Sequence, residues 1–115
     1  MFIVSDGPRK DKEGEKETVW RIREDILKNI DWPYKIKILF RKKNLGCKYA
    51  VSGAIDWFFK NVEQGIILED DYLPSKDFFI FCKKLLDRYK DKEKIMIISG
   101  NNFIENKTKT QNETF

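Results

Sequence analysis

The stretch GIILEDDYLPSKDFF, residues 65–79, places three consecutive acids directly after an apolar run and just before a helical pattern. The apolar residues 66–68 are typical of a buried strand, and the acids at 69–71 follow without a break. Ser75 or Asp77 then offers a side chain that can cap the first turn of a helix. Adjacent carboxylates repel each other, so water, a basic side chain or a metal ion must offset their charge.

Similar apolar runs recur along the chain at intervals of roughly thirty residues, about the length of a strand–helix unit. The runs are MFIV at 1–4, KIKILF at 35–40, GIIL at 65–68 and IMIIS at 95–99. Strands that are separated by single helices pair in parallel through right-handed crossovers. The sequence therefore predicts an α/β fold, a three-layer sandwich with a mainly parallel sheet of about four strands and flanking helices. Residues 1–103 would form this domain, and residues 104–115 a polar tail.

Three segments show apolar residues at helical spacing, the second beginning near Asn44 and the third running from about Asp77 to Tyr89. The residues of their apolar stripes are Val19, Ile22, Ile26 and Ile30 in the first, Ala50, Ala54 and Trp57 or Phe58 in the second, and Phe78, Phe81, Leu85 and Leu86 in the third. Gly46 and Gly53 are expected to allow close helix packing.

Composition limits the possible functions of this 115-residue chain. It contains no histidine, which excludes histidine-based catalytic triads and the common zinc sites. The net charge of +4 allows an anionic partner without requiring one. Because the lysines are scattered among acids, we expect no nucleic acid as partner.

The sequence shows no signal peptide and no apolar stretch of the ~20 residues that a membrane span needs. Cys47 and Cys82 are too far apart to suggest a zinc pair, and two cysteines do not make a disulfide framework. We therefore expect a cytoplasmic protein with buried, reduced thiols.

Polar residues follow every apolar run at the point where the predicted strand ends. They are SDGPR at 5–9, RKKNLG at 41–46, EDDYLP at 69–74 and SGNNF at 99–103. Ligands bind beyond the carboxyl ends of parallel strands, so these groups should meet at one edge. Two are acidic, one is cationic and one is rich in amides, a mixture that suits a ligand with phosphates and hydroxyl-bearing rings. Carboxylates there could hold Mg²⁺ or Mn²⁺, or they could cap the next helix or pair with lysines.

The segment EDDYLPSKDFFIFCKKLL, residues 69–86, resembles the acid motif and following helix of nucleotide-sugar glycosyltransferases of the GT-A fold. The resemblance is closest to the N-acetylglucosaminyltransferase I type. FIVSDGP at 2–8 is similar to that family's second strand with its base-binding Asp, and SGNNF at 99–103 to the strand end after the acid motif. The three motifs occur in the same order and span about the first hundred residues.

The resemblance implies a metal-dependent transferase that moves a sugar from a nucleoside-diphosphate sugar, with a UDP-sugar favoured, to a hydroxyl acceptor such as a glycan. Asp71 would bind the Mn²⁺ or Mg²⁺ ion, and Glu69 and Asp70 would contact the ribose, the base or metal-bound water. Asp6 would accept a hydrogen bond from the base. A turn-forming role before Gly7 is the alternative for Asp6.

Two further positions correspond to the nucleotide and sugar contacts of this family. Arg41 lies where a basic or polar residue approaches the nucleotide, and a solvated loop at 41–43 is the alternative. Asn101 would contact the sugar or the acceptor, with turn chemistry at 101–102 as the alternative.

The GT-A pattern also includes a strand and helix before the SDGP motif and an acceptor-binding half that usually supplies the catalytic base in inverting enzymes. Neither is found in this sequence, so the chain is expected to be the donor-binding part of a longer protein, and no residue is predicted as the base. The alternative is a non-catalytic α/β module that binds a nucleotide or metal and pairs with a partner chain or a second copy across an exposed sheet edge.

Overall fold

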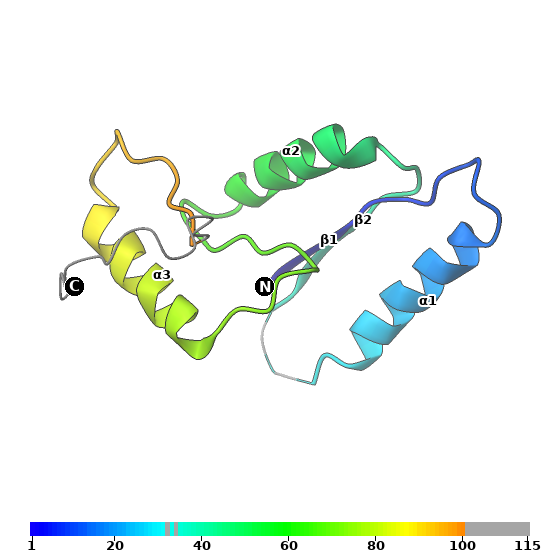
Figure 1. Ribbon diagram of the computed structural model, residues 1–115, viewed down its shortest axis with the longest axis horizontal. Helices are drawn as coiled ribbons and strands as arrows, with labels where there is room; N and C mark the ends of the chain where they lie inside the picture. The colour runs from blue at the N-terminus through cyan, green and yellow to red at the C-terminus, as the bar shows by residue number, and fades with distance from the viewer. Residues whose placement is uncertain (32, 34, 101–115) are drawn as a thin grey trace, which may run out of the picture. The chain divides into compact units, whose positions relative to one another are not determined.

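The computed structural model describes residues 1–31, 33 and 35–100, and it is a mixed α/β structure (Figure 1). Its elements are β1 (Phe2–Ser5), α1 (Glu15–Lys28), β2 (Lys37–Phe40), α2 (Gly46–Phe59) and α3 (Lys76–Tyr89). The chain divides into two compact units, Met1–Glu63 and Gln64–Phe115. The first unit holds both strands with α1 and α2, and the second holds α3.

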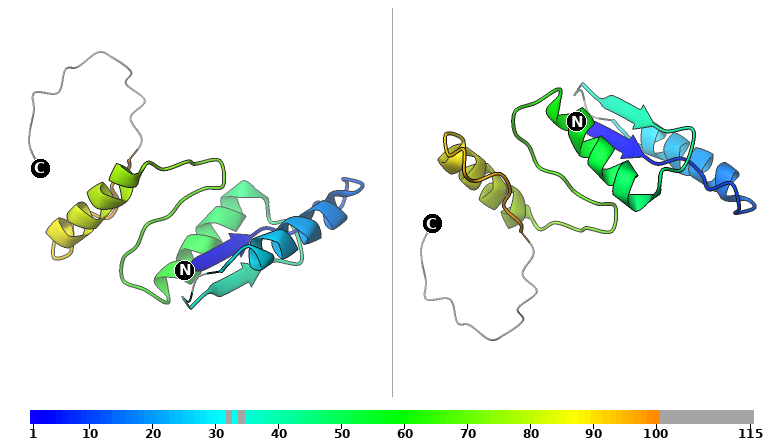
Figure 2. Two further views of the ribbon diagram at one scale, coloured as in Figure 1. Left: turned by 90° about the horizontal axis from the view of Figure 1, so that it is seen from below. Right: turned by 90° about the horizontal axis from the view of Figure 1, so that it is seen from above.

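The two strands pair in parallel, with Phe2 opposite Lys37 and Ser5 opposite Phe40. Helices α1 and α2 cover opposite faces of this pair, as the two views of Figure 2 show. On the α2 face, the Phe2 ring meets Trp57 and Phe58 edge to face, with ring centroids 5.2 and 5.0 Å apart. The predicted β-α-β-α start of the chain is therefore confirmed, and so is the packing of Trp57 and Phe58 on the sheet.

The face of α1 that meets the sheet differs from the predicted stripe at one position. Val19 and Ile26 are half-buried as expected, but Ile22 is 50 % exposed. Arg23 takes its place and is only 4 % exposed, although it is charged. It lies four residues after Val19 and three before Ile26, which is the spacing of one helix face. The prediction was wrong because it admitted only apolar side chains to the stripe.

The buried Arg23 guanidinium connects the carboxyl ends of both strands. Its Nε donates to Ser5 Oγ at 3.1 Å, and its Nη2 donates to the backbone oxygens of Ser5, Asp6 and Arg41 at 3.2, 2.8 and 2.9 Å. Its charged carbon also lies 4.8 Å from the centre of the Phe40 ring, a cation–π distance. Burial lowers the pKa of Arg23, but a guanidinium stays protonated in proteins. These contacts determine where the chain goes after each strand.

The third and fourth apolar runs, residues 65–68 and 95–99, are not strands in the described part of the chain, where the sheet has two strands. Ile67, Met96 and Ile97 are 50, 93 and 88 % exposed. A strand persists only where a neighbour pairs its backbone and covers its apolar side chains, and much of the apolar surface of these runs is uncovered here. The predicted four-stranded sandwich is thus reduced to two strands between two helices. The predicted tail at 104–115 lies outside the described residues.

Helix α3 follows its prediction closely. Ser75 caps it, and the Ser75 hydroxyl oxygen accepts a hydrogen bond from the Phe78 amide at 3.2 Å. Leu85 of the predicted stripe is buried, and Phe78, Phe81 and Leu86 are half-buried. No helix in the described part of the chain combines the length and the apolar character that crossing a bilayer requires.

We expect Arg23→Ala to lower the free energy of unfolding by roughly 2–3 kcal/mol, because three backbone oxygens and the Ser5 hydroxyl lose their shared donor in a buried place. Urea unfolding followed by circular dichroism measures the change. Arg21→Ala on the exposed side of the same helix is the matched control and should stay within ~0.5 kcal/mol of wild type. Equal losses in both variants would contradict the assignment.

Candidate functional site

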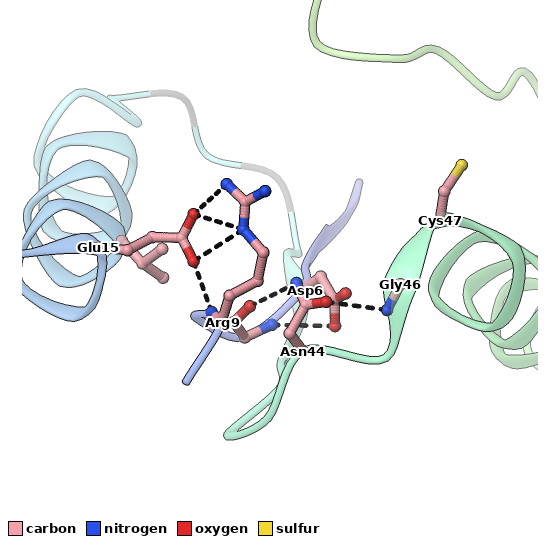
Figure 3. Close-up of a pocket in the computed structure, with 8 residues that line it drawn as sticks. Asp6, Arg9, Glu15, Asn44, Gly46 and Cys47 are labelled. Atoms are coloured by element: carbon pink, nitrogen blue, oxygen red, sulfur yellow. Dashed lines mark hydrogen bonds and ion pairs between the residues drawn. The ribbon is translucent and has the colours of Figure 1, made fainter. Parts of the chain in front are cut away.

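A hollow of about 420 Å³ opens in the first unit, beyond the carboxyl ends of β1 and β2 (Figure 3). Its wall comes from the loops that follow the two strands and from the first turns of α1 and α2. The lining residues are Asp6, Gly7, Arg9, Glu15, Val19, Asn44, Gly46 and Cys47. This is the edge at which open parallel sheets bind their ligands, as the sequence predicted.

Asp6 lies in the wall of the hollow and ties β1 to the start of α2. Its Oδ1 accepts hydrogen bonds from the amides of Gly7 and Leu45 at 2.9 and 3.1 Å, and its Oδ2 accepts from the Leu45 amide at 2.9 Å. The Asp6 carboxylate therefore joins its own loop to the start of α2, and because residues 6–9 do not form a turn, the turn-forming role of Asp6 is not confirmed. A carboxylate offers about four acceptor positions, so Oδ2 can take one more donor. The contact with a nucleotide base stays a prediction.

The two loops that follow the strands touch each other at Gly7. A side-chain carbon built on Gly7 would lie 2.4 Å from the carbonyl carbon of Lys43, so only glycine fits this position. Asn44 strengthens the junction, because its Nδ2 donates to the Gly7 oxygen at 2.9 Å and its Oδ1 accepts from the Gly46 amide at 3.0 Å. Gly46 has a φ of +74° and no neighbour near its missing side chain. Glycine is therefore suited to this position because of its left-handed backbone conformation, and the predicted role of Gly46 in helix packing was wrong.

Arg9 and Glu15 form an ion pair on the α1 side of the hollow (Figure 3). The Nε and Nη2 groups of Arg9 both donate to the Glu15 carboxylate, and the Arg9 backbone amide donates to the same carboxylate. These hydrogen bonds lower the pKa of Glu15 to about 2, and the same pair raises the pKa of Arg9. The pair anchors the loop after β1 to the first turn of α1.

Arg41 does not line the hollow. Its Nη1 donates to the Tyr49 oxygen in α2 at 3.3 Å, and its guanidinium lies against Gly53, where an added side-chain carbon would be 3.0 Å away. The neighbour of Gly53 is thus the flexible end of the Arg41 side chain, and the predicted close helix packing at Gly53 stays a prediction. The contact of Arg41 with a nucleotide stays a prediction.

The acids Glu69, Asp70 and Asp71 belong to the second unit and are all exposed. The Tyr72 amide donates to the Glu69 oxygen at 3.2 Å and closes a turn around them. No described lysine or arginine forms an ion pair with them, and α3 is capped by Ser75. In the described part of the chain, no group of three or more acids or cysteines is close enough to hold a metal ion. Asn101 lies outside the described residues.

The sequence analysis missed Glu15, which looks like an ordinary helix-end residue. Arg9 and Asn44 belong to the strand-end segments 5–9 and 41–46 that were expected at this edge, but no individual role in the site was predicted for them. Arg23 could have been found from its position, because it is a charged residue at helical spacing from Val19 and Ile26 of the apolar stripe. Cys47 was expected to be buried but is exposed beside the hollow, whereas burial raises the pKa of the half-buried Cys82.

We expect the Glu15 carboxyl to titrate near pH 2 in a ¹³C NMR experiment, and Arg9→Gln to return it toward the ordinary value of 4.5. Because the folded-state pKa is depressed, the stabilisation is complete above about pH 4.5 and is lost as the pH falls toward 2. Arg21→Gln is the control and should leave the titration unchanged. A wild-type midpoint near 4.5 would show that the pair does not form.

Comparisons of this chain with protein-family models, with curated proteins and with solved structures found no match. Its function therefore has to be argued from its own residues and their geometry.

Proposed function

We propose that this chain forms the donor-binding part of a metal-dependent glycosyltransferase of the GT-A type. It would bind a nucleoside-diphosphate sugar, with a UDP-sugar favoured, and the sugar would pass to a hydroxyl acceptor. The observation that carries the proposal is the hollow at the strand ends, where Asp6 keeps an acceptor position for a base or ribose group. The order of the three sequence motifs supports the same function.

The placement of α1 and α2 supports a larger sheet than the described one. Phe2 faces α2, whereas Ser5, on the other side of the same strand, contacts Arg23 of α1. Because crossovers are right-handed, a helix on the second face directs the next strand to the free edge of β1. We therefore propose that residues 65–68 add there as the third strand and that residues 95–98 form the fourth. Their exposed apolar side chains would then be covered.

In the proposed sheet, the acids at 69–71 follow the third strand and lie at the same edge as Asp6. Their carboxylates are exposed and form no ion pair with a described cation, so they are free to bind a hard divalent ion. Asp71 would hold Mn²⁺ or Mg²⁺, and Glu69 and Asp70 would face the nucleotide. The ion would neutralise charge on the departing diphosphate. Asp6 would orient the base.

We expect wild-type protein to bind UDP in the presence of Mn²⁺ but not in EDTA, and Asp71→Asn to weaken this binding at least tenfold, on the order of 1.4 kcal/mol. Isothermal titration calorimetry measures both. Asp87→Asn, an exposed acid on α3, is the matched control and should bind as wild type does. The proposal fails if wild type shows no Mn²⁺-dependent binding or if Asp71→Asn binds equally well.

A non-catalytic module that pairs with a partner chain is the second candidate, and the exposed side chains of Met96 and Ile97 favour it. A paired strand would bury them across the interface. Sedimentation velocity at several concentrations tests the case in which the partner is a second copy. This alternative requires a dimer that Ile97→Lys dissociates, whether or not the chain binds UDP. A monomer at all concentrations would exclude pairing with a second copy.

A further inference from the structure

A second hollow, of about 390 Å³, adjoins the first and differs from it in charge. It is lined by Pro8, Arg9, Lys10, Asp11, Lys43 and Asn44. Arg9 and Asn44 line both hollows, so the two lie next to each other at the strand-end loops. We refer to the second one as the basic hollow.

The basic hollow carries an excess of positive charge. Three of its residues are cationic and one, Asp11, is acidic. Arg9 is already paired with Glu15, but neither Lys10 nor Lys43 forms an ion pair with a described carboxylate. Both lysines are exposed, so their ammonium groups are accessible to a ligand from solvent. With Arg9 paired to Glu15, the two lysines outnumber Asp11, and the net positive charge of a concave site attracts anions.

The two lysines come from different loops that are fixed against each other. Lys10 follows β1 and Lys43 follows β2, and the loops meet where the Gly7 backbone touches that of Lys43. The Asn44 side chain locks this junction through its 2.9 Å hydrogen bond to the Gly7 oxygen. Arg9, the residue before Lys10, is held by Glu15. The backbone that presents both charges is thus organised before a ligand arrives, which lowers the entropy cost of binding.

We propose that the basic hollow binds a phosphate or diphosphate group directly, without a metal ion, through Lys10 and Lys43. The several oxygens of such a tetrahedral group can accept hydrogen bonds from two ammonium groups at once. A ligand that extends beyond its phosphate would pass Asn44 and reach the free acceptor position of Asp6. This site does not depend on Asp71 or on a divalent cation, so it does not rest on the proposed transferase activity.

The test is a ¹H–¹⁵N NMR titration of the full chain with pyrophosphate, in EDTA and at constant ionic strength. We expect saturable shifts of the Lys10, Lys43 and Asn44 amides. Because exposed charge contacts are individually weak and distant sites add, each single Lys→Gln change should weaken binding about threefold and Lys10→Gln/Lys43→Gln together about tenfold. Gly7→Ala should also weaken it, because the added carbon pushes the two loops apart.

A control variant that loses the same amount of charge elsewhere distinguishes binding at the basic hollow from general attraction of the anion to a positively charged protein. Lys60→Gln/Lys83→Gln removes two exposed lysines elsewhere in the chain and should leave pyrophosphate affinity within twofold of wild type. An equal loss in the control would mean that scattered lysines bind the anion, and absence of saturable shifts would also overturn the proposal. Asp71→Asn should bind pyrophosphate with the affinity of wild type. The pyrophosphate titration therefore tests the basic hollow even if the proposed metal-dependent donor site does not exist. Titration with inorganic phosphate and with UDP in EDTA then shows whether one phosphate suffices or a nucleotide adds affinity.

Discussion

The buried guanidinium of Arg23 is the contact on which the first unit depends. Removing a charge from water costs several kcal/mol, and Arg23 offsets this cost with four neutral oxygens and the Phe40 ring instead of a carboxylate. Its donors bind the last residue of β1 and the first residue after each strand. One side chain therefore links α1 to both strands and sets the direction of both loops that leave the sheet. The functional groups are carried by those loops.

This anchoring explains why a small two-stranded unit can present an organised site. A pair of four-residue strands is marginal by itself, so the loops at its end would otherwise be mobile. Arg23 fixes their first residues, Gly7 lets them touch, and the Asp6 and Asn44 side chains join them further on. The result is two adjoining hollows with different chemistry, one with a carboxylate acceptor and one with two free lysines.

Sequence patterns predicted the elements whose causes are local. The period of apolar residues located three helices, and Ser75 predicted the start of α3, because a cap acts within one turn. The burial of Arg23 was not predicted, because it depends on oxygen atoms eighteen residues away in the sequence, and a periodic pattern within one helix does not reveal such contacts. The runs at 65–68 and 95–99 show the same limit for strands. Their composition is suited to a sheet, but strand formation depends on the neighbour that pairs with them. For Asp6 the sequence left two roles open, and the structure shows a further one, a contact with the Leu45 amide of the neighbouring loop.

Two sets of charges in this chain lack a described partner, and they require opposite ligands. The carboxylates at 69–71 need a cation, and Lys10 with Lys43 need an anion. Folding does not neutralise either set within the described residues, and a solvated surface alone does not explain why the lysines line a hollow with a fixed backbone. We propose a nucleoside diphosphate with a divalent ion for the carboxylates and a phosphate or diphosphate for the lysines, because carboxylates bind hard divalent cations and ammonium groups bind phosphate oxygens. The two proposals thus have independent tests but the same chemical class of ligand.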